Sequence, residues 1–422
     1  MKIDLEELVQ AQVIDQEAAT RITDYYQATR KADQKNHLIR LVSIIGVTMV
    51  GLGLLLIVAY NWDQMPKSIK LLFAILPLAG AQTSGLFTLT KKSTSITWKE
   101  VSSLAILFGV GIALALITQI YQLDYALSVY LKWWILLSLP LIYVFDSSVT
   151  SCAIWIGIAW YLSDSRWTDG SYHLGLTLGI ILVAAVPYAW KLIKKQTPYA
   201  WTWHHWLVPL VLIQFLFTLN PLVCNKLTLI HLVILIMIYD SISETLFNGS
   251  LTLSHGYKVI SFVGLTIMGF MMSFKFFWLG TEITRWRSCA ATTHWIIPAV
   301  FAVLLIAVLV YNWSLRKDIK SHVIPGISIL LVLLIASAEW LGSGGRIIAN
   351  LLLLSGAGYM MYRGILTERL ATLNLGVILL AIWVICRFFE SDISFVWRGI
   401  IFIALGLLCF LLNFSLIRKK KS

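Results

Sequence analysis

Residues 39–60 read IRLVSIIGVTMVGLGLLLIVAY, and this stretch decides the fold. Arg40 is its only charged residue, and most of the others are apolar. A helix needs about 20 such residues to cross the hydrocarbon core of a bilayer. Within hydrocarbon, a helix satisfies all its own backbone hydrogen bonds, so a continuous apolar run of this length predicts a membrane-spanning helix.

Similar runs recur along the whole chain. Of its 422 residues, 59% are hydrophobic and 13% are charged, whereas soluble proteins have about 45–50% and about 25%. The pattern predicts an all-α polytopic transmembrane helix bundle of about fourteen spans. Twelve or thirteen spans remain alternatives, because the fourth, fifth and seventh runs are short. The predicted runs are 39–60, 68–88, 101–121, 131–146, 148–163, 172–192, 205–220, 227–247, 257–279, 293–313, 322–340, 346–362, 369–387 and 396–417.

The remaining segments define the predicted domain organisation. Residues 1–38 are polar and predict a cytoplasmic helical hairpin, in which Asp15 caps the second helix. Residues 39–417 form the transmembrane helix bundle, and residues 418–422 form a basic cytoplasmic tail. The hairpin either packs as a cap on the bundle or provides a docking site for a protein partner.

The positive charge of the chain is explained by membrane topology. The net charge is +12, but the basic residues lie in short loops and not on one face of a soluble domain, so no nucleic-acid partner is predicted. With fourteen spans and a cytoplasmic N-terminus, about two thirds of the 33 Lys and Arg residues lie on the cytoplasmic side. We therefore expect a multi-pass protein of the bacterial cytoplasmic (inner) membrane, embedded in the lipid bilayer, with both termini in the cytoplasm.

Several polar residues fall at the predicted outer ends of spans. Polar and ionisable groups in membrane segments are costly, so each is a candidate for function. They form either one polar, outward-opening cavity that binds a substrate or a set of polar helix ends that are hydrated separately and share no site. These candidate substrate-binding residues are Asn61, Trp62, Asp63, Gln119, Tyr121, Glu339, Arg346, Arg387 and Glu390.

A second group lies in the predicted span 227–247. Asp240 and Glu244 are four residues apart and share one helix face. Such a pair is typical of a proton or ion relay. The alternative is an interfacial pair that is hydrated from the cytoplasm or neutralised by Lys258.

The sequence carries no signature of an enzyme, a metal site or a cofactor site. It contains no nucleophile elbow, no H-E-x-x-H zinc motif and no phosphate-binding loop. The adjacent His204 and His205 point in different directions on a helix and are poor co-ligands, and the five cysteines are scattered. We predict no metal, no cofactor and no catalytic residue, and an enzymatic role is not favoured.

Several segments resemble a bacterial membrane-protein family known as domain of unknown function 2157. They include Val13–Ala18, Ala59–Asp63 with the Pro66 that follows, and Gln119–Tyr121. The resemblance is clear over roughly residues 1–145, and Arg387–Glu390 is similar to the end of the same or a sister family. It implies a bacterial inner-membrane protein and brings no established activity.

Three functions remain open at this point. The first is a transporter or flippase that alternates access around a polar cavity. The second is a non-enzymatic membrane scaffold or assembly factor for envelope proteins. The third is a lipid-linked transferase with a site on the outer face.

Overall fold

The computed structural model describes residues 15–21, 49, 64–124, 126–165, 174–194, 201–219, 225–247, 255–278, 295–315, 323–342, 344–390, 396, 400, 403 and 407. The chain divides into two compact units, Met1–Ile75 and Leu76–Ser422. The boundary predicted at residue 38 lies outside the described residues and stays a prediction.

The described part of the first unit is small. Residues 16–21 are helical, and the Asp15 carboxylate accepts a hydrogen bond of 2.7 Å from the backbone N–H of Ala18. Asp15 is therefore an N-cap, as the sequence predicted. The rest of the predicted hairpin and the decisive stretch 39–60, apart from residue 49, lie outside the described residues.

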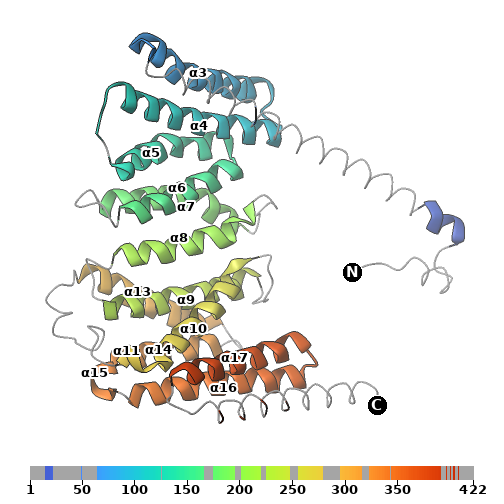
Figure 1. Ribbon diagram of the computed structural model, residues 1–422. Coiled ribbons are helices and arrows are strands. Elements are labelled where there is room, and N and C mark those ends of the chain that lie inside the picture. Colours follow the sequence, from blue (N-terminus) through green and yellow to red (C-terminus); the bar gives the residue numbers. More distant parts are fainter. Residues whose placement is uncertain are drawn as a thin grey trace. The chain divides into compact units, whose positions relative to one another are not determined.

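The described residues form helices and no strand. Figure 1 shows the helices of the second unit lying roughly side by side in successive layers. The helices with their bounds are α3 (Lys67–Lys91), α4 (Ile96–Ile120), α5 (Leu127–Phe145), α6 (Ser148–Asp164), α7 (Leu174–Ile193), α8 (His204–Thr218), α9 (Asn225–Phe247), α10 (Gly256–Ser273), α11 (Lys275–Trp278), α13 (Ile296–Leu315), α14 (Val323–Ala336), α15 (Ala338–Leu341), α16 (Gly344–Leu366) and α17 (Leu370–Glu390).

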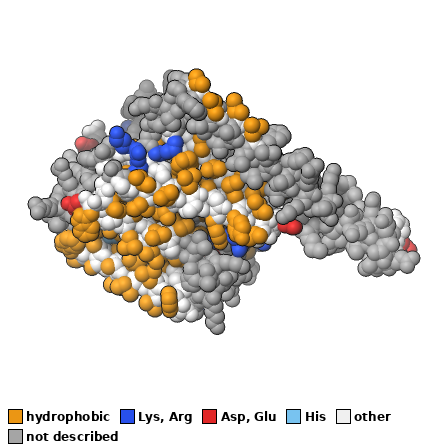
Figure 2. Space-filling view, turned by 90° about the horizontal axis from the view of Figure 1, so that it is seen from below, with side chains coloured by type: hydrophobic (Ala, Val, Ile, Leu, Met, Phe, Trp, Pro, Cys, Tyr) orange, Lys and Arg blue, Asp and Glu red, His pale blue; other side chains and the backbone are white. Residues whose placement is uncertain are grey.

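Eight of the described helices are long and apolar enough to cross a membrane: α3, α4, α5, α7, α9, α10, α13 and α17. The predicted count of fourteen is not confirmed. Two predicted spans, 257–279 and 322–340, are interrupted, because α10 ends before Phe274 and α14 ends before Ser337. Much of the surface is apolar, as Figure 2 shows for one face, and exposed side chains such as Leu182 and Ile306 match a lipid solvent.

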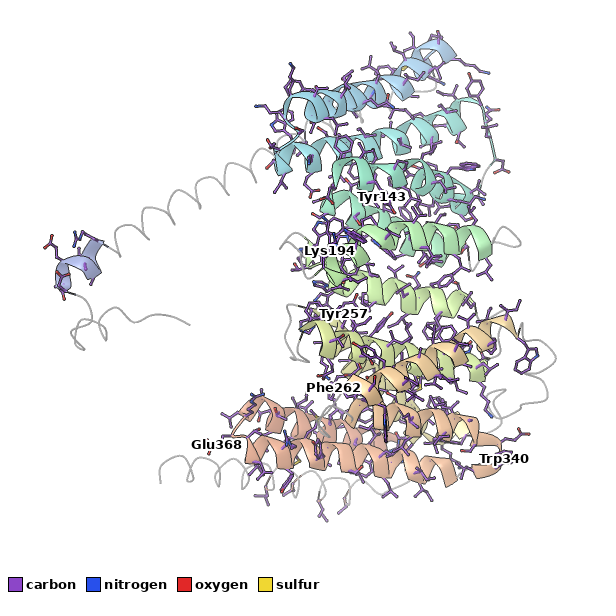
Figure 3. All side chains as sticks on the ribbon, turned by 180° about the vertical axis from the view of Figure 1, so that it is seen from behind. Tyr143, Lys194, Tyr257, Phe262, Trp340 and Glu368 are labelled. Atoms are coloured by element: carbon purple, nitrogen blue, oxygen red, sulfur yellow. The ribbon has the colours of Figure 1, made fainter. Side chains whose placement is uncertain are left out.

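Contacts between helix ends show which helix ends lie on the same side of the second unit. Ser147, just before α6, contacts Glu100 near the start of α4, and Lys258 near the start of α10 contacts Asp240 and Glu244 near the end of α9. We call this side of the unit the Glu100 end. The opposite side, where α10 ends and α16 begins, is the Ser273 end. Figure 3 shows Lys194 and Glu368 on the first side and Trp340 on the second.

Glu100 is the main connection between α4 and α6. Its carboxylate accepts hydrogen bonds from the backbone N–H of Ser148 and of Val149, both at 2.9 Å. It also accepts one from the Ser148 hydroxyl at 2.7 Å and one from the Ser147 hydroxyl. A carboxylate at a helix N-terminus accepts hydrogen bonds from backbone N–H groups that have no partner within the helix. Its negative charge also interacts favourably with the positive end of the helix dipole.

Replacing Glu100 by Ala removes the acceptor of both amides, so we expect a loss of about 2 kcal/mol of unfolding free energy. Chemical unfolding of the detergent-solubilised protein measures this loss. Thr97→Ala on the same turn, where the side chain is exposed, provides the control. Equal stability of the two variants would contradict the capping role.

Close backbone contact also joins α16 to α17. A Cβ at Gly364 would lie 2.5 Å from the Leu373 nitrogen and 2.7 Å from its Cα. A Cβ at Gly358, on the same helix, would meet nothing within 4 Å. The chain therefore offers a matched pair of glycines, one at a contact and one in open space.

Gly364→Ala should force the two helices apart and lower the free energy of unfolding by roughly 1–3 kcal/mol, because the added methyl group displaces the backbone of α17. Gly358→Ala should leave stability unchanged or slightly higher, since Ala favours helix more than Gly does. Thermal melting in detergent distinguishes the two. A melting temperature of the Gly364 variant at or above that of the Gly358 variant would refute this packing.

Candidate functional site

Helix α9 is the centre of the candidate site. It packs against α8, α10, α13 and α14, and it is more buried than the other candidate spans. Its residues belong to both hydrophobic clusters of the unit: Tyr239 to the cluster around α6, and Val233 and Ile236 to the cluster around α10 and α14. Several polar groups on α9, including Asp240, Ser241 and Ser243, are therefore buried by neighbouring helices.

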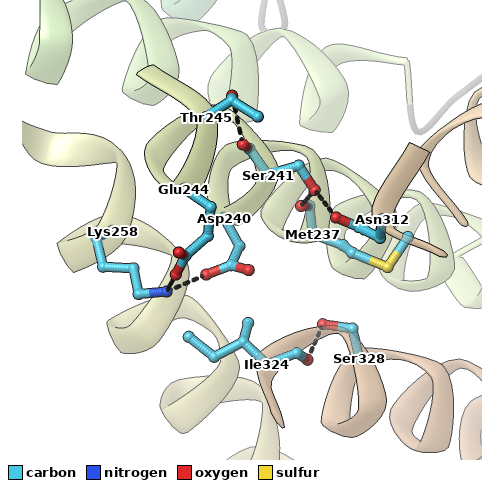
Figure 4. Close-up of polar contacts among 9 residues, drawn as sticks. All are labelled: Met237, Asp240, Ser241, Glu244, Thr245, Lys258, Asn312, Ile324 and Ser328. Carbon is cyan, nitrogen blue, oxygen red and sulfur yellow. Dashed lines mark hydrogen bonds and ion pairs between the residues drawn. The ribbon is translucent and has the colours of Figure 1, made fainter. Parts of the chain in front are cut away.

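Three charged side chains meet between α9 and α10. The Lys258 ammonium lies 2.6 Å from Asp240 Oδ1 and 2.5 Å from Glu244 Oε1 (Figure 4). The Asp240 side chain is 0% exposed, that of Lys258 13% and that of Glu244 22%. We call these three residues the acid–lysine triad. The pairing with Lys258, which the sequence offered as one alternative, is present in the structure.

The triad combines two carboxylates with one ammonium. Ionisable groups within membrane segments are costly, and they mark pathways of ions and protons. The triad is therefore a candidate for an ion or proton site.

Further polar atoms lie on the same helices and on α13. The Ser241 hydroxyl oxygen lies 3.1 Å from Asn312 Oδ1 and 2.9 Å from the Met237 carbonyl oxygen, and its single proton can be donated to either. The side-chain amide nitrogen of Asn312 and the hydroxyls of Ser243 and Ser261 are buried without a hydrogen-bond partner. Buried polar atoms of this kind call for an explanation, such as water or a ligand.

A network of aromatic and histidine side chains adjoins the triad at the Glu100 end. The Tyr188 hydroxyl lies 2.6 Å from His205 Nδ1 and 2.8 Å from the hydroxyl of Tyr257, the neighbour of Lys258. His204 instead contacts the Ser151 hydroxyl at 2.9 Å. The two imidazoles thus form hydrogen bonds with different residues, although both rings lie against the ring of Tyr188.

His255 precedes α10 at the same end. Burial lowers the pKa of His255, and the nearby Lys258 ammonium lowers it further. Its ring stacks on Phe247, with 4.3 Å between the centroids. The imidazole is therefore neutral near pH 7 and adds no charge beside the triad.

Arg387 anchors a second polar cluster at the Ser273 end. Its guanidinium donates to the Ser273 carbonyl oxygen at 2.8 Å and lies 4.8 Å from the centroid of the Phe274 ring. Asn350 donates to the same carbonyl at 3.1 Å and accepts from the Trp383 indole at 2.7 Å. Asn350 was missed in the sequence, although an amide inside an apolar run is a recognisable signal.

The predicted substrate-binding residues are only partly brought together. Arg346 and Arg387 lie at the Ser273 end, and Glu339 is exposed there and interacts electrostatically with Lys226. Gln119 and Tyr121 are exposed at the end of α4, and the layers of α5, α6, α8, α9 and α10 separate them from α17. Asn61, Trp62 and Asp63 and the Glu390 side chain lie outside what the structure describes.

The described residues contain no group of three or more His, Cys, Asp or Glu side chains that could hold a metal ion.

Replacing Lys258 by Met leaves two acids without their shared cation. We expect the free energy of unfolding to fall by about 3–5 kcal/mol, the usual effect of removing one partner of a buried ion pair. The double variant Asp240→Asn/Lys258→Met should recover part of that loss, because Glu244 is more exposed. Lys194→Met, at an exposed position, is the control, and chemical unfolding is the measurement. A double variant less stable than the single one would argue against charge compensation.

Comparisons with known proteins gave a family match for part of the chain. No curated protein and no solved structure matched it. The matching family model is described as predicted membrane protein (DUF2157). Residues 6–151 match it, and this match confirms over that region the family that the sequence resembles, domain of unknown function 2157.

Proposed function

We propose that the protein is a secondary membrane transporter whose cycle includes protonation of the acid–lysine triad. The observation that carries the proposal is the contact of the buried Asp240 and the partly exposed Glu244 with Lys258 between two candidate spans. Ionisable groups inside membrane segments are costly and mark ion pathways and proton relays.

In the proposed cycle the triad alternates between two states that differ by one proton. In the structure Lys258 contacts both carboxylates. A proton on one acid would weaken the attraction of that acid to Lys258 and leave Lys258 paired with the other acid. Binding of a proton would therefore change which acidic residue of α9 is paired with Lys258 of α10. A local change of this kind can bias a conformational equilibrium.

Access to the triad is proposed from the Glu100 end. Asp240 is buried, whereas Lys258 and Glu244 are partly exposed. Lys91, Lys92, Lys191, Lys194 and Arg363 lie at this end, in segments that the fourteen-span prediction places on the cytoplasmic side together with about two thirds of all Lys and Arg residues. We therefore propose that the Glu100 end faces the cytoplasm, in keeping with the positive-inside rule.

The cluster at the Ser273 end is the proposed contact for the transported solute. The Arg387 guanidinium donates to the Ser273 carbonyl oxygen and lies against the Phe274 ring, and a guanidinium is the side-chain group that best matches a carboxylate or phosphate. Arg346 lies at the start of the neighbouring α16. An anionic solute, including a lipid headgroup, fits this end better than a cation does.

A pH jump tests the proton step without knowledge of the solute. Protein in liposomes is adsorbed on a solid-supported membrane, and the external pH is changed from 7.5 to 6. We expect a transient current from proton binding in the wild type, because the bound charge moves partway into the low-dielectric region. Asp240→Asn should reduce the displaced charge by about tenfold, and Glu244→Gln should reduce it less.

Lys194→Gln provides the control, because Lys194 lies exposed at the same end and outside the triad. Solubilised variants should show unchanged elution in gel filtration before reconstitution. The proposal is overturned by a wild type without a transient current, or by an Asp240→Asn variant whose displaced charge equals that of the wild type.

A further inference from the structure

A tyrosine stands directly before each of two charged residues of the acid–lysine triad. Tyr239 precedes Asp240 on α9, and Tyr257 precedes Lys258 on α10. Successive side chains on a helix point about 100° apart, so each tyrosine lies beside its charged neighbour and faces a different helix. The two tyrosine rings are buried and contact each other edge to face, with 5.8 Å between their centroids. They form a second contact between α9 and α10 beside the triad.

The hydroxyls of both tyrosines connect to one segment of α8. The Tyr239 hydroxyl donates to the Pro209 carbonyl oxygen at 2.9 Å. The Tyr257 hydroxyl lies 2.8 Å from the hydroxyl of Tyr188 on α7, and the Tyr188 hydroxyl lies 2.6 Å from Nδ1 of His205. His205 and Pro209 are about one helical turn apart. The same turn of α8 therefore anchors both sides of the triad.

The chain from Tyr257 through Tyr188 to His205 can be satisfied without any charge. A tyrosine hydroxyl has one proton to donate, and a neutral imidazole has one nitrogen that accepts. In the arrangement that satisfies all three groups, Tyr257 donates to Tyr188, and Tyr188 donates to His205. All three side chains are buried, and a buried polar group that loses its partner is costly. The chain therefore holds Tyr257 in place and adds no charge beside the triad.

Close packing at Gly256 supports the same anchoring. A Cβ added at Gly256 would lie 2.7 Å from the His205 carbonyl oxygen and 2.7 Å from Cδ2 of the Trp206 ring. A residue without a side chain is therefore needed where α10 begins against α8. Tyr257 and Lys258 are the next two residues, so the approach of α10 to α8 also places them.

The other charged groups around the triad come from few elements. His255, just before α10, lies near both Lys258 and His205. Helices α13 and α14, which also pack against α9, carry no acidic, basic or histidine side chain. Helix α16, which packs against α10, carries Arg346 and Arg363. A change from tyrosine to phenylalanine leaves all these charges in place, so its effect on Lys258 reports the loss of a hydroxyl alone.

We propose that Tyr257 is a positioning residue whose hydrogen-bonded chain to Tyr188 and His205 holds Lys258 in register with the two acids of α9. Without the Tyr257 hydroxyl, the first turn of α10 loses this connection to α7 and α8. The Lys258 ammonium then spends more time away from the carboxylates. The positioning itself requires no activity, whereas its consequence for proton binding rests on the proposed transport cycle.

The reactivity of the Lys258 amine tests the positioning directly. The full-length protein in detergent is treated with acetic anhydride for increasing times and digested with chymotrypsin, and mass spectrometry gives the acetylation rate of each lysine. An ammonium held by two carboxylates reacts slowly, because acetylation requires the neutral amine. Tyr257→Phe should raise the rate at Lys258 by roughly threefold to tenfold, the effect of one lost hydrogen bond. The exposed Lys194 is the internal reference.

Tyr143→Phe is the matched control. It also removes a tyrosine hydrogen bond between helices, from the Tyr143 hydroxyl on α5 to the Val183 carbonyl oxygen on α7 at 2.5 Å. It should leave acetylation of Lys258 unchanged. Tyr188→Phe should act like Tyr257→Phe, and the double variant should add little, because both residues belong to one chain. Gel filtration and circular dichroism establish that the variants fold.

The pH-jump assay gives a second readout, the pH at which the displaced charge is half of its maximum. A less firmly held Lys258 attracts the carboxylates less, so they take up a proton at higher pH. Tyr257→Phe should raise this pH by roughly 0.5–1 unit and leave the maximal displaced charge unchanged. Tyr143→Phe should change neither quantity.

The two readouts distinguish failure of this proposal from failure of the transport proposal. A wild type without a transient current would overturn the transport cycle, and the acetylation rates would still decide the role of Tyr257. Unchanged acetylation of Lys258 in a folded Tyr257→Phe variant would overturn the positioning role. An equal increase in the Tyr143→Phe variant would also overturn it, because the effect would then be a general loosening of the helices.

Discussion

Hydrocarbon offers no hydrogen-bond partner to a peptide group, and the rest of this structure follows from that constraint. Helices satisfy the hydrogen bonds of their own backbone, so the polar side chains are the groups that still require partners. Many of them bond to carbonyl oxygens of neighbouring helices: Trp134 to Leu107, Tyr130 to Gly111 and Gln214 to Ala159. A carbonyl oxygen has two lone pairs and can accept a second hydrogen bond without loss of the helical one. Adjacent layers are thus joined by polar contacts as well as by apolar packing.

Charged groups obey the same constraint more strictly. Glu100 is accommodated because four donors at the start of α6 converge on it. Arg387 is accommodated by a carbonyl dipole and an aromatic face. In the acid–lysine triad, Lys258 lies within ion-pair distance of both Asp240 and Glu244, so one ammonium serves two carboxylates.

The helix positions were predictable from the sequence, because hydropathy over about 20 residues is a local property. The predicted runs 68–88, 101–121 and 227–247 correspond closely to α3, α4 and α9. The interruptions at Phe274 and Ser337 were not predictable in this way, since both lie within continuous apolar runs. Nor was the contact of Arg387 with Ser273, 114 residues away, because a single sequence does not say which helices are neighbours. The Asp240–Lys258 pair could be named in advance only because one short loop joins its helices.

Helix α10 connects the two polar clusters of the second unit. It carries Lys258 near its first turn and Ser273 as its last residue. Lys258 pairs with Asp240 and Glu244 of α9, and the Ser273 carbonyl oxygen accepts hydrogen bonds from Arg387 and Asn350. A change in the interactions at either end would therefore act on the same helix, and a shared element of this kind is one requirement for coupling between two sites.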